Sequence, residues 1–254
     1  MSFCLIILAG GNSHRFRSNM GKPYQKIAGK SLIEINLNKA TRLKQIKKFI
    51  LVYNKKDLKR VKSLKLKNVK LVVGGKNRQQ STYNALKYLA NQKGISKVLI
   101  HDVARPNFST KLLKAILRNM RNHRAVVPKL EVQDAIKQII DSSKEEYIVG
   151  KKRDNLFLTQ TPQAFNLKEI YYLHKTNFSK YKDDDISLYM DLNKVKFIEG
   201  EKSNFKITDK IDFENLRNIY KSKQSVGIGF DVHRLVPKRK LYLAGLKIKS
   251  KLGT

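Results

Sequence analysis

Short apolar segments that alternate with helical patterns most constrain how this chain can fold. The segments are Phe3–Leu8, Phe49–Tyr53, Val69–Val73, Lys97–His101, Ala125–Pro128 and Val195–Glu199. Several are continuous apolar runs, which indicates strands buried on both faces, as in a parallel sheet. Helical stretches lie near Leu32–Leu43, Arg78–Asn91, Thr110–Asn122, Leu167–Phe178 and Asp209–Lys221. This alternation predicts a doubly wound α/β sheet whose ligands bind beyond the carboxyl ends of its strands.

Two segments depart from the alternation. The short strand-like pieces Ala135–Ile140 and Tyr147–Val149, with polar breaks between them, predict a protruding β-arm. The pattern leaves open whether this arm packs on its own domain or on another subunit. Near the end, a polar stretch precedes a new glycine-rich segment and an apolar piece, Lys240–Ile248. We therefore expect one domain over 1–222 and the start of a second over 223–254.

The formal net charge is +34, from 54 Lys and Arg against 20 Asp and Glu. Such an excess suggests a nucleic-acid or phosphate-rich partner. The lysines are spread along nearly the whole chain, including surface positions such as Lys44, Lys47 and Lys48. This spread favours solvated faces over a dedicated polyanion site, and we expect no specific nucleic-acid partner. A basic surface would still attract nucleotide and phosphate substrates to a cleft.

The apolar run near the amino terminus bears on the expected cellular location. Phe3–Leu8 is too short for a membrane span and lacks the basic flank and cleavage site of a signal peptide. Cys4 is the only cysteine, so no intrachain disulfide forms, and its apolar neighbours predict a buried thiol. We expect a cytoplasmic protein with no membrane partner.

The first predicted strand runs directly into a turn of small residues, Leu8-Ala9-Gly10-Gly11. Small residues let backbone N–H groups approach phosphate oxygens. The turn is neither G-x-G-x-x-G nor a Walker A sequence, which disfavours a dinucleotide or P-loop site. Taken alone, it is as typical of a structural turn as of a phosphate cradle. Two bases, Arg15 and Lys22, follow it before Pro23.

This small-residue turn, followed by an arginine and then a lysine, resembles the nucleotidyltransferase superfamily. Further motifs narrow the resemblance to the methylerythritol-phosphate cytidylyltransferases, in matching order and spacing over roughly the first 220 residues. They are Gly74-Gly75-Lys76-Asn77-Arg78-Gln79-Gln80-Ser81, His101-Asp102-Val103-Ala104-Arg105-Pro106, Thr161-Pro162-Gln163-Ala164-Phe165 and Asn204-Phe205-Lys206-Ile207-Thr208. The resemblance implies a Rossmann-like nucleotidyltransferase sheet with a protruding β-arm. It also implies transfer of CMP from CTP to methylerythritol phosphate in isoprenoid precursor synthesis.

The resemblance further implies which residues form the site. Arg15 and Lys22 would contact the triphosphate, and Arg153 and Lys206 the phosphate of the acceptor, with Arg153 reaching across from a neighbouring subunit of a homodimer. Asp102 would hold Mg²⁺ against the triphosphate, since a hard cation prefers oxygen ligands. The other nucleotide-binding residues would be Ala9, Gly10, Gly11, Gly74, Gly75, Arg78 and Ser81.

Several of these residues also have a purely structural interpretation. For Asp102, the alternative to holding Mg²⁺ is a loop cap bonded to Arg105. The segment from Gly74 to Ser81 would serve equally as a strand-exit turn and a helix N-terminus, and Ser81 either meets the nucleoside or supports its pocket. The reaction itself needs no strong general base, because the attacking oxygen belongs to a phosphate anion. Catalysis would then rest on positioning and charge stabilisation.

The chain departs from the family pattern at some positions. Ala135 stands where threonine is usual, and Ser203 replaces a commonly acidic residue, which puts a second Mg²⁺ ligand in doubt. His14 and the order Gly21-Lys22-Pro23 are further departures. These changes keep open a related acceptor such as ribitol phosphate. From another class, a basic nucleic-acid-binding module is the alternative that charge alone suggests.

The segment Ser225–Leu235 resembles the opening strand of methylerythritol cyclodiphosphate synthase. Asp231 and His233, two residues apart, would point to one side of a strand and supply two ligands of a divalent metal such as Zn²⁺. In that family a later histidine completes the site. The resemblance therefore implies a bifunctional fusion whose second, α/β synthase domain is represented by a short fragment without cyclase activity.

Overall fold

The computed structural model describes residues 1–11, 16, 20–141, 146–149, 153–177, 183–189, 195–221, 230 and 232–254. For 138–141 and 146–149 it describes the backbone alone. The chain divides into two compact units, Met1–Tyr220 and Lys221–Thr254. The division into functional domains at 222/223 stays a prediction.

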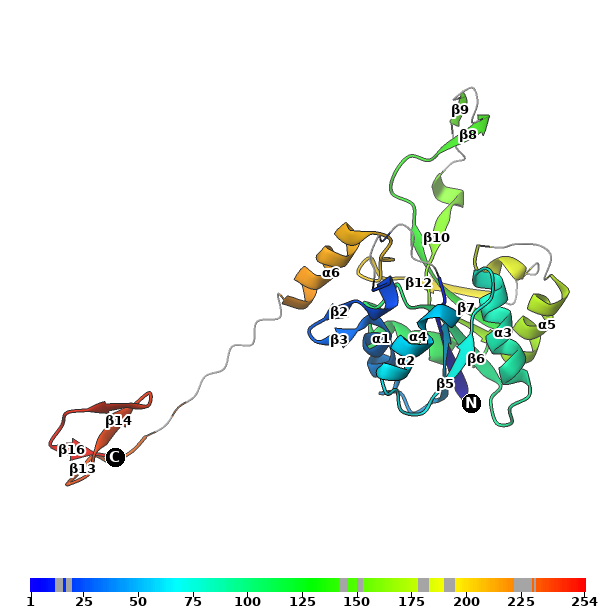
Figure 1. The fold of residues 1–254 in the computed structure, drawn as a ribbon. Coiled ribbons are helices and arrows are strands. Elements are labelled where there is room, and N and C mark those ends of the chain that lie inside the picture. The colour runs from blue at the N-terminus through cyan, green and yellow to red at the C-terminus, as the bar shows by residue number, and fades with distance from the viewer. Residues whose placement is uncertain are drawn as a thin grey trace. The chain divides into compact units, whose positions relative to one another are not determined.

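The first unit is built around a mixed sheet of eight strands (Figure 1). From one edge the order is β5 (Val69–Val73), β4 (Ile46–Tyr53), β1 (Phe3–Ala9), β6 (Lys97–Asp102), β11 (Gln163–Asn166), β7 (Ala125–Glu131) and β12 (Val195–Glu199). The eighth strand, β10 (Phe157–Thr159), pairs with β7 beyond the end of β11. Strands β5, β4, β1 and β6 are parallel, whereas β11 is antiparallel to both neighbours. The predicted α/β sheet is confirmed, and the antiparallel strands β10 and β11 are additions that the pattern did not predict.

Helices cover both faces of the sheet, which explains the continuous apolar runs. Odd-numbered side chains of β1 enter one core and even-numbered ones, including Cys4, enter the other. The first core is covered by α1 (Leu32–Ala40), α2 (Leu58–Ser63), α4 (Thr110–Asn119) and α6 (Lys210–Lys221). The second is covered by α3 (Arg78–Ala90) and α5 (Leu167–Thr176). Burial raises the pKa of the Cys4 thiol to about 12, so the predicted buried thiol is confirmed.

Side-chain caps fix where the helices begin relative to the strand ends. Ser31 and Glu34 form a reciprocal capping box at α1, with the Glu34 N–H 3.2 Å from Ser31 Oγ. Helices α3, α4 and α5 are capped by Asn77, Ser109 and Asn166. The side chain of each accepts a hydrogen bond from a backbone N–H of the first turn. Asn77 matters most for function, because it starts α3 directly after the glycine turn that follows β5.

The remaining elements of the first unit are short. They are the 3₁₀ turns η2 (Lys22–Tyr24), η3 (Lys55–Asp57), η4 (Arg153–Asn155) and η5 (Ile186–Leu188), the pair β2 (Lys26–Ile27) and β3 (Lys30–Ser31), and the pair β8 (Lys137–Asp141) and β9 (Glu146–Val149). Among the described strands, β8 and β9 pair with each other and with no other strand, as expected for the predicted arm.

The second unit consists of two small antiparallel pairs. These are β13 (Val236–Pro237) with β16 (Leu252–Gly253), and β14 (Leu241–Leu243) with β15 (Leu246–Ile248). The opening strand predicted within 225–235 is not observed over Val232–Leu235, where His233 is exposed and lies in no strand. Asp231 and the residues 225–229 lie outside the described residues. Across the described parts of both units, no helix is long and apolar enough to cross a membrane.

Candidate functional site

A cavity of about 500 Å³ lies at the carboxyl ends of the parallel strands. Strands β4 and β5 continue the sheet on one side of β1, and β6 lies on the other, so the chain order reverses between β1 and β6. Such a switch point is where open α/β sheets bind ligands. Most of the predicted site residues line this cavity, namely Ala9, Gly10, Gly11, Lys22, Gly75, Arg78, Ser81, Asp102 and Lys206.

The turn between β5 and α3 forms one wall of the cavity. A side chain at Gly74 would place its Cβ 3.1 Å from Ser81 Oγ, and one at Gly75 would overlap the side chain of Gln80. The Ser81 hydroxyl accepts from the Gly75 N–H at 3.0 Å and donates to the Asn77 carbonyl at 2.8 Å. A side chain at Gly75 therefore requires Gln80 to move, one at Gly74 requires a small shift of its neighbours, and Ser81 holds the turn in place.

Asp102, the last residue of β6, is the acidic centre of the site. Its Oδ1 lies 3.1 Å from Arg78 Nε and its Oδ2 lies 3.0 Å from Lys206 Nζ. Burial alone would raise the pKa of Asp102, but Arg78 and Lys206 hold that pKa far below its usual range. The alternative of a loop cap bonded to Arg105 is met by the backbone, where the Arg105 N–H donates to the Asp102 carbonyl at 3.0 Å, while the Arg105 side chain donates through Nη1 to the Asn204 carbonyl at 2.9 Å.

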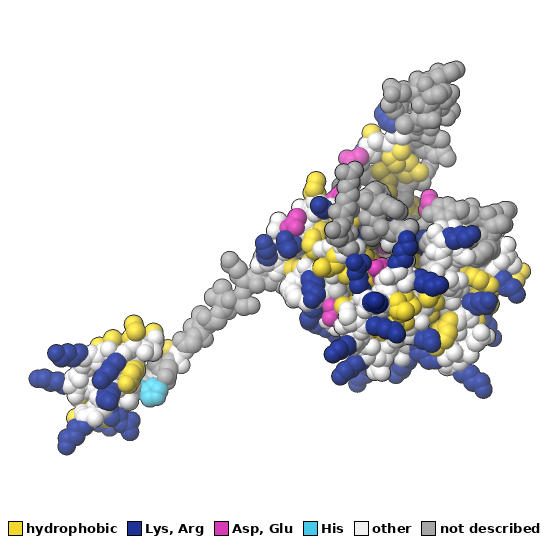
Figure 2. Space-filling view, in the orientation of Figure 1, with side chains coloured by type: hydrophobic (Ala, Val, Ile, Leu, Met, Phe, Trp, Pro, Cys, Tyr) yellow, Lys and Arg dark blue, Asp and Glu magenta, His cyan; other side chains and the backbone are white. Residues whose placement is uncertain are grey.

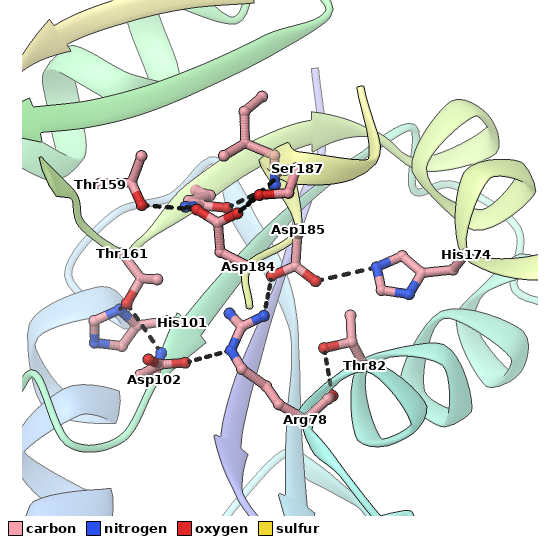
Figure 3. A network of polar contacts seen from close by, with 12 residues as sticks. Arg78, Thr82, His101, Asp102, Thr159, Thr161, His174, Asp184, Asp185 and Ser187 are labelled. Atoms are coloured by element: carbon pink, nitrogen blue, oxygen red, sulfur yellow. Dashed lines mark hydrogen bonds and ion pairs between the residues drawn. The ribbon is translucent and has the colours of Figure 1, made fainter. Parts of the chain in front are cut away.

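Beyond Asp102, Arg78 continues into a series of buried polar contacts that the sequence motifs do not indicate. Arg78 Nη1 lies 2.8 Å from Asp185 Oδ2, and Asp185 Oδ1 lies 3.0 Å from His174 Nε2 (Figure 3). The side chains of Asp185 and His174 are each 1% exposed. Burial alone would raise the pKa of Asp185. The charge of Arg78 and, after it, the hydrogen bond with His174 outweigh burial and lower that pKa. The only sequence signal was a run of acidic residues, Asp183 to Asp185, in a strongly basic chain.

His101 fixes the backbone on which Asp102 stands. Its Nδ1 lies 3.0 Å from Thr161 Oγ1, and both residues are labelled in Figure 3. His101 Nε2 lies 2.7 Å from Asn36 Oδ1. The same Thr161 hydroxyl accepts from the Asp102 N–H at 3.1 Å. Complete burial lowers the pKa of His101 to about 3, so the ring is neutral, with Nε2 donating to Asn36 and Nδ1 accepting from Thr161.

Lys22 approaches the cavity from the loop that follows β1. Gly21, at φ 74°, allows the turn into η2, which accounts for the order Gly21-Lys22-Pro23. Lys22 Nζ donates to the Ile207 carbonyl at 2.7 Å. Because Ile207 is the neighbour of Lys206, this bond brings two predicted bases to the same side of the cavity.

A second cavity, of about 530 Å³, adjoins the first. Arg78, Asp102 and Lys206 line both. The second cavity also presents hydroxyl, carboxylate and guanidinium groups, from Thr159, Thr161, Asp183, Asp184, Ser187 and Arg105. Cations suit a phosphate and the other polar groups suit hydroxyls, so this cavity is chemically fitted to a phosphorylated polyol.

Some predicted residues are not brought to either cavity. Arg153, in η4, lines neither, and its Nη1 donates to the Gln133 carbonyl at 2.6 Å. Ser203 is exposed, and its carbonyl accepts from Asn107 Nδ2 at 3.1 Å. Arg15 lies outside the described residues. Among those that are described, no three His, Cys, Asp or Glu side chains gather in a way that would hold a metal ion.

Comparison with known proteins assigns the family. Residues 3–221 match the family described as IspD, 2-C-methyl-D-erythritol 4-phosphate cytidylyltransferase. The chain belongs to this family. The expected nucleotidyltransferase fold and cytidylyltransferase class are thereby confirmed, and the family's reaction is transfer of a cytidylyl group to methylerythritol phosphate.

Individual relatives agree with the assignment. The chain is 44% identical over 255 residues to the bifunctional enzyme IspD/IspF of Pelagibacter ubique (strain HTCC1062), covering 100% of this chain and 66% of that protein. It is 32% identical over 212 residues to the 2-C-methyl-D-erythritol 4-phosphate cytidylyltransferase of Thermosipho africanus (strain TCF52B), covering 80% of this chain and 91% of that protein. The chain thus spans about two thirds of the length of the bifunctional relatives.

Solved structures lead to the same family. The 4-diphosphocytidyl-2C-methyl-D-erythritol synthase of Anaerococcus prevotii DSM 20548 superposes with a TM-score of 0.73 at 32% identity, over 87% of this chain and 96% of that one. The bifunctional IspDF of Campylobacter jejuni gives 0.72 at 26% identity, over 100% of this chain and 64% of that one. The IspD fold therefore accounts for the first unit.

Proposed function

We propose that this chain transfers CMP from CTP to 2-C-methyl-D-erythritol 4-phosphate and releases pyrophosphate. The observation that carries the proposal is the junction of the two cavities, where Arg78, Asp102 and Lys206 face both. A nucleotide in the first cavity and a phosphorylated polyol in the second would meet at these three side chains. Family membership supplies the identity of the two substrates.

The junction suits a reaction between two anions. A phosphate oxygen of the acceptor attacks the α-phosphorus of CTP, and the bond from that phosphorus to the oxygen of the β-phosphate breaks. Pyrophosphate carries away the electron pair, and no proton has to be removed from the nucleophile. Lys22, Arg78 and Lys206 offset the repulsion between the anions and stabilise the charge that develops at phosphorus. Arg15 is proposed to assist at the triphosphate.

Mg²⁺ is the proposed cofactor, and Asp102 would hold it. A magnesium ion usually takes one or two protein carboxylates and completes its shell with phosphate oxygens and water. Asp102 fits this pattern, because its depressed pKa keeps it ionised and it lines the nucleotide cavity. The Lys206 side chain is 44% exposed, which allows it to exchange Asp102 for a substrate phosphate. When bound, the ion would neutralise triphosphate charge.

The quaternary structure is proposed to be a homodimer. Arg153 lines neither cavity of its own chain, so its proposed contact with the acceptor phosphate requires a neighbouring subunit. We further propose that 223–254 begins a second domain like that of the bifunctional relatives, with Asp231 and His233 among its metal ligands. Cytoplasmic location also stays a prediction.

The described residues on the visible face do not form the basic stripe expected of a nucleic-acid-binding surface. Figure 2 shows Lys and Arg side chains scattered over the visible face, with other side chains between them, instead of gathered in one stripe. A dispersed charge of this kind is typical of solvated faces.

Pyrophosphate release from CTP and Mg²⁺ tests the proposal, with methylerythritol phosphate, ribitol phosphate or no acceptor added. We expect release with methylerythritol phosphate alone. Lys22→Ala should reduce the rate about 10²-fold or more, since it removes a cation from the developing charge. Lys44→Ala, a change at an exposed lysine, is the matched control and should leave the rate intact. Release with ribitol phosphate alone would reassign the acceptor, and equal rates for the two variants would refute the role of Lys22.

A further inference from the structure

The buried pair behind the site, Asp185 and His174, has no part in the reaction as described above. Asp185 precedes η5, and His174 lies on α5, so both come from segments distant in sequence from the nucleotide turn. They reach the site through one residue, Arg78. Arg78 is the first residue of α3 and lines both cavities.

Arg78 is held from two opposite sides. Its Nε donates to Asp102 at 3.1 Å, and its Nη1 faces Asp185 at 2.8 Å. Its third nitrogen, Nη2, is buried and has no hydrogen-bond partner among the described residues. Because protein atoms enclose Nη2, the contacts of Nε and Nη1 with the two carboxylates decide how the guanidinium lies. The two carboxylates thus fix the guanidinium plane beside Asp102 at the junction of the cavities.

His174 in turn fixes Asp185. An ionised carboxylate only accepts hydrogen bonds, so the contact between His174 Nε2 and Asp185 Oδ1 at 3.0 Å makes Nε2 the donor. With one oxygen held by His174, the other is aimed at Arg78. Both side chains are almost completely buried, so water does not compete for these bonds. The order of support runs from His174 to Asp185, to Arg78 and to Asp102 (Figure 3).

We propose that Asp185 and His174 are positioning residues, which orient Arg78 so that it holds the carboxylate of Asp102 in place at the junction of the two cavities. The proposal rests on the proposed cytidylyltransferase function for the identity of the ligands that meet Asp102 at this junction. It adds to that function a pair of residues that contact neither cavity's ligand directly and act through Arg78.

The test compares variants that break or keep each bond. Asp185→Asn removes the charge facing Arg78, and His174→Leu removes the donor to Asp185. His174→Gln retains a donor near the position of Nε2 and is the conservative rescue. Ile170→Ala, on the same helix as His174 and fully buried, is the control for a change that weakens packing alone. Each variant is measured for kcat, for KM of both substrates, for CTP affinity by calorimetry and for thermal stability.

We expect Asp185→Asn and His174→Leu to lower kcat/KM by about 10-fold to 100-fold, the usual effect of losing a group that orients a ligand-binding side chain. CTP should also bind more weakly to both. His174→Gln should recover most of the loss. Ile170→Ala should lower the melting temperature and leave the kinetics and the CTP affinity of the folded enzyme unchanged.

Each outcome separates the two proposals. If the wild-type chain turns over and all variants match it once folded, the positioning role is refuted while the proposed function stands. Losses shared by Ile170→Ala would refute it as well, because packing alone would explain them. If the wild type shows no turnover, the proposed function fails. Weaker CTP binding in Asp185→Asn, against unchanged binding in Ile170→Ala, would then still support the positioning role.

Discussion

The hydroxyl of Thr161 provides a test of how the fold holds Asp102 in place. This hydroxyl accepts from the Asp102 N–H at 3.1 Å and faces His101 Nδ1 at 3.0 Å. Thr161 is 4% exposed and His101 is fully buried. Thr161→Val keeps the shape of the side chain and removes both bonds. The change leaves one buried donor and one buried acceptor without a partner.

The size of the effect follows from these two groups. A buried polar group left without a partner costs about 1–3 kcal/mol, so the pair amounts to about 2–6 kcal/mol, with local relaxation favouring the lower end. For a unit of this size, a loss of about 3 kcal/mol lowers the melting temperature by about 6–12 °C. Thr161→Ser is the matched control, because it retains the hydroxyl and loses one methyl group, worth about 1 kcal/mol.

Urea unfolding followed by far-UV circular dichroism measures the difference, since the chain contains no tryptophan. We expect Thr161→Val to unfold at a clearly lower urea concentration than Thr161→Ser. Pyrophosphate release should fall in the same order, because Asp102 loses a backbone contact. If Thr161→Val were as stable as Thr161→Ser, the argument that this hydroxyl satisfies two buried groups would be wrong.

Three further changes test other parts of the structure. The free energy of unfolding should fall as the pH drops from 6.5 towards 3, because His101 binds a proton in the unfolded chain at its ordinary pKa of 6.5 but in the folded chain only near 3. The urea midpoint of unfolding, measured across this pH range, checks the prediction. A midpoint that stays constant over the range would contradict it. Gly75→Ala should lower the free energy of unfolding by about 1–3 kcal/mol, because the new Cβ would overlap the side chain of Gln80. Gly10→Ala is the control, since its Cβ would make ordinary contacts, and it should unfold nearly like the wild type. Cys4 should resist a thiol reagent in the native protein and react once urea unfolds it, and rapid native labelling would refute its burial.

The sequence located the strands well and the helix ends less well. Helix α1 ends at Ala40 although the apolar pattern continues to Leu43. Leu43 is buried in the core from a turn beyond the helix, so apolar periodicity alone overestimates the helix length. Strands β10 and β11 were missed because they are short and are joined in space through β7, a pairing that no local pattern records.

The sequence alone determined the parts of the site that lie directly after a strand. The small-residue turn after β1, the Gly74-Gly75 turn before α3 and Asp102 at the end of β6 all follow from strand ends, and parallel strands bring those ends to one edge. The tertiary structure determined which side chains Arg78 and Asp102 contact. Asp185 meets Arg78, and His174 meets Asp185, only because α5 and the segment before η5 pack beside α3, and burial there strengthens both contacts.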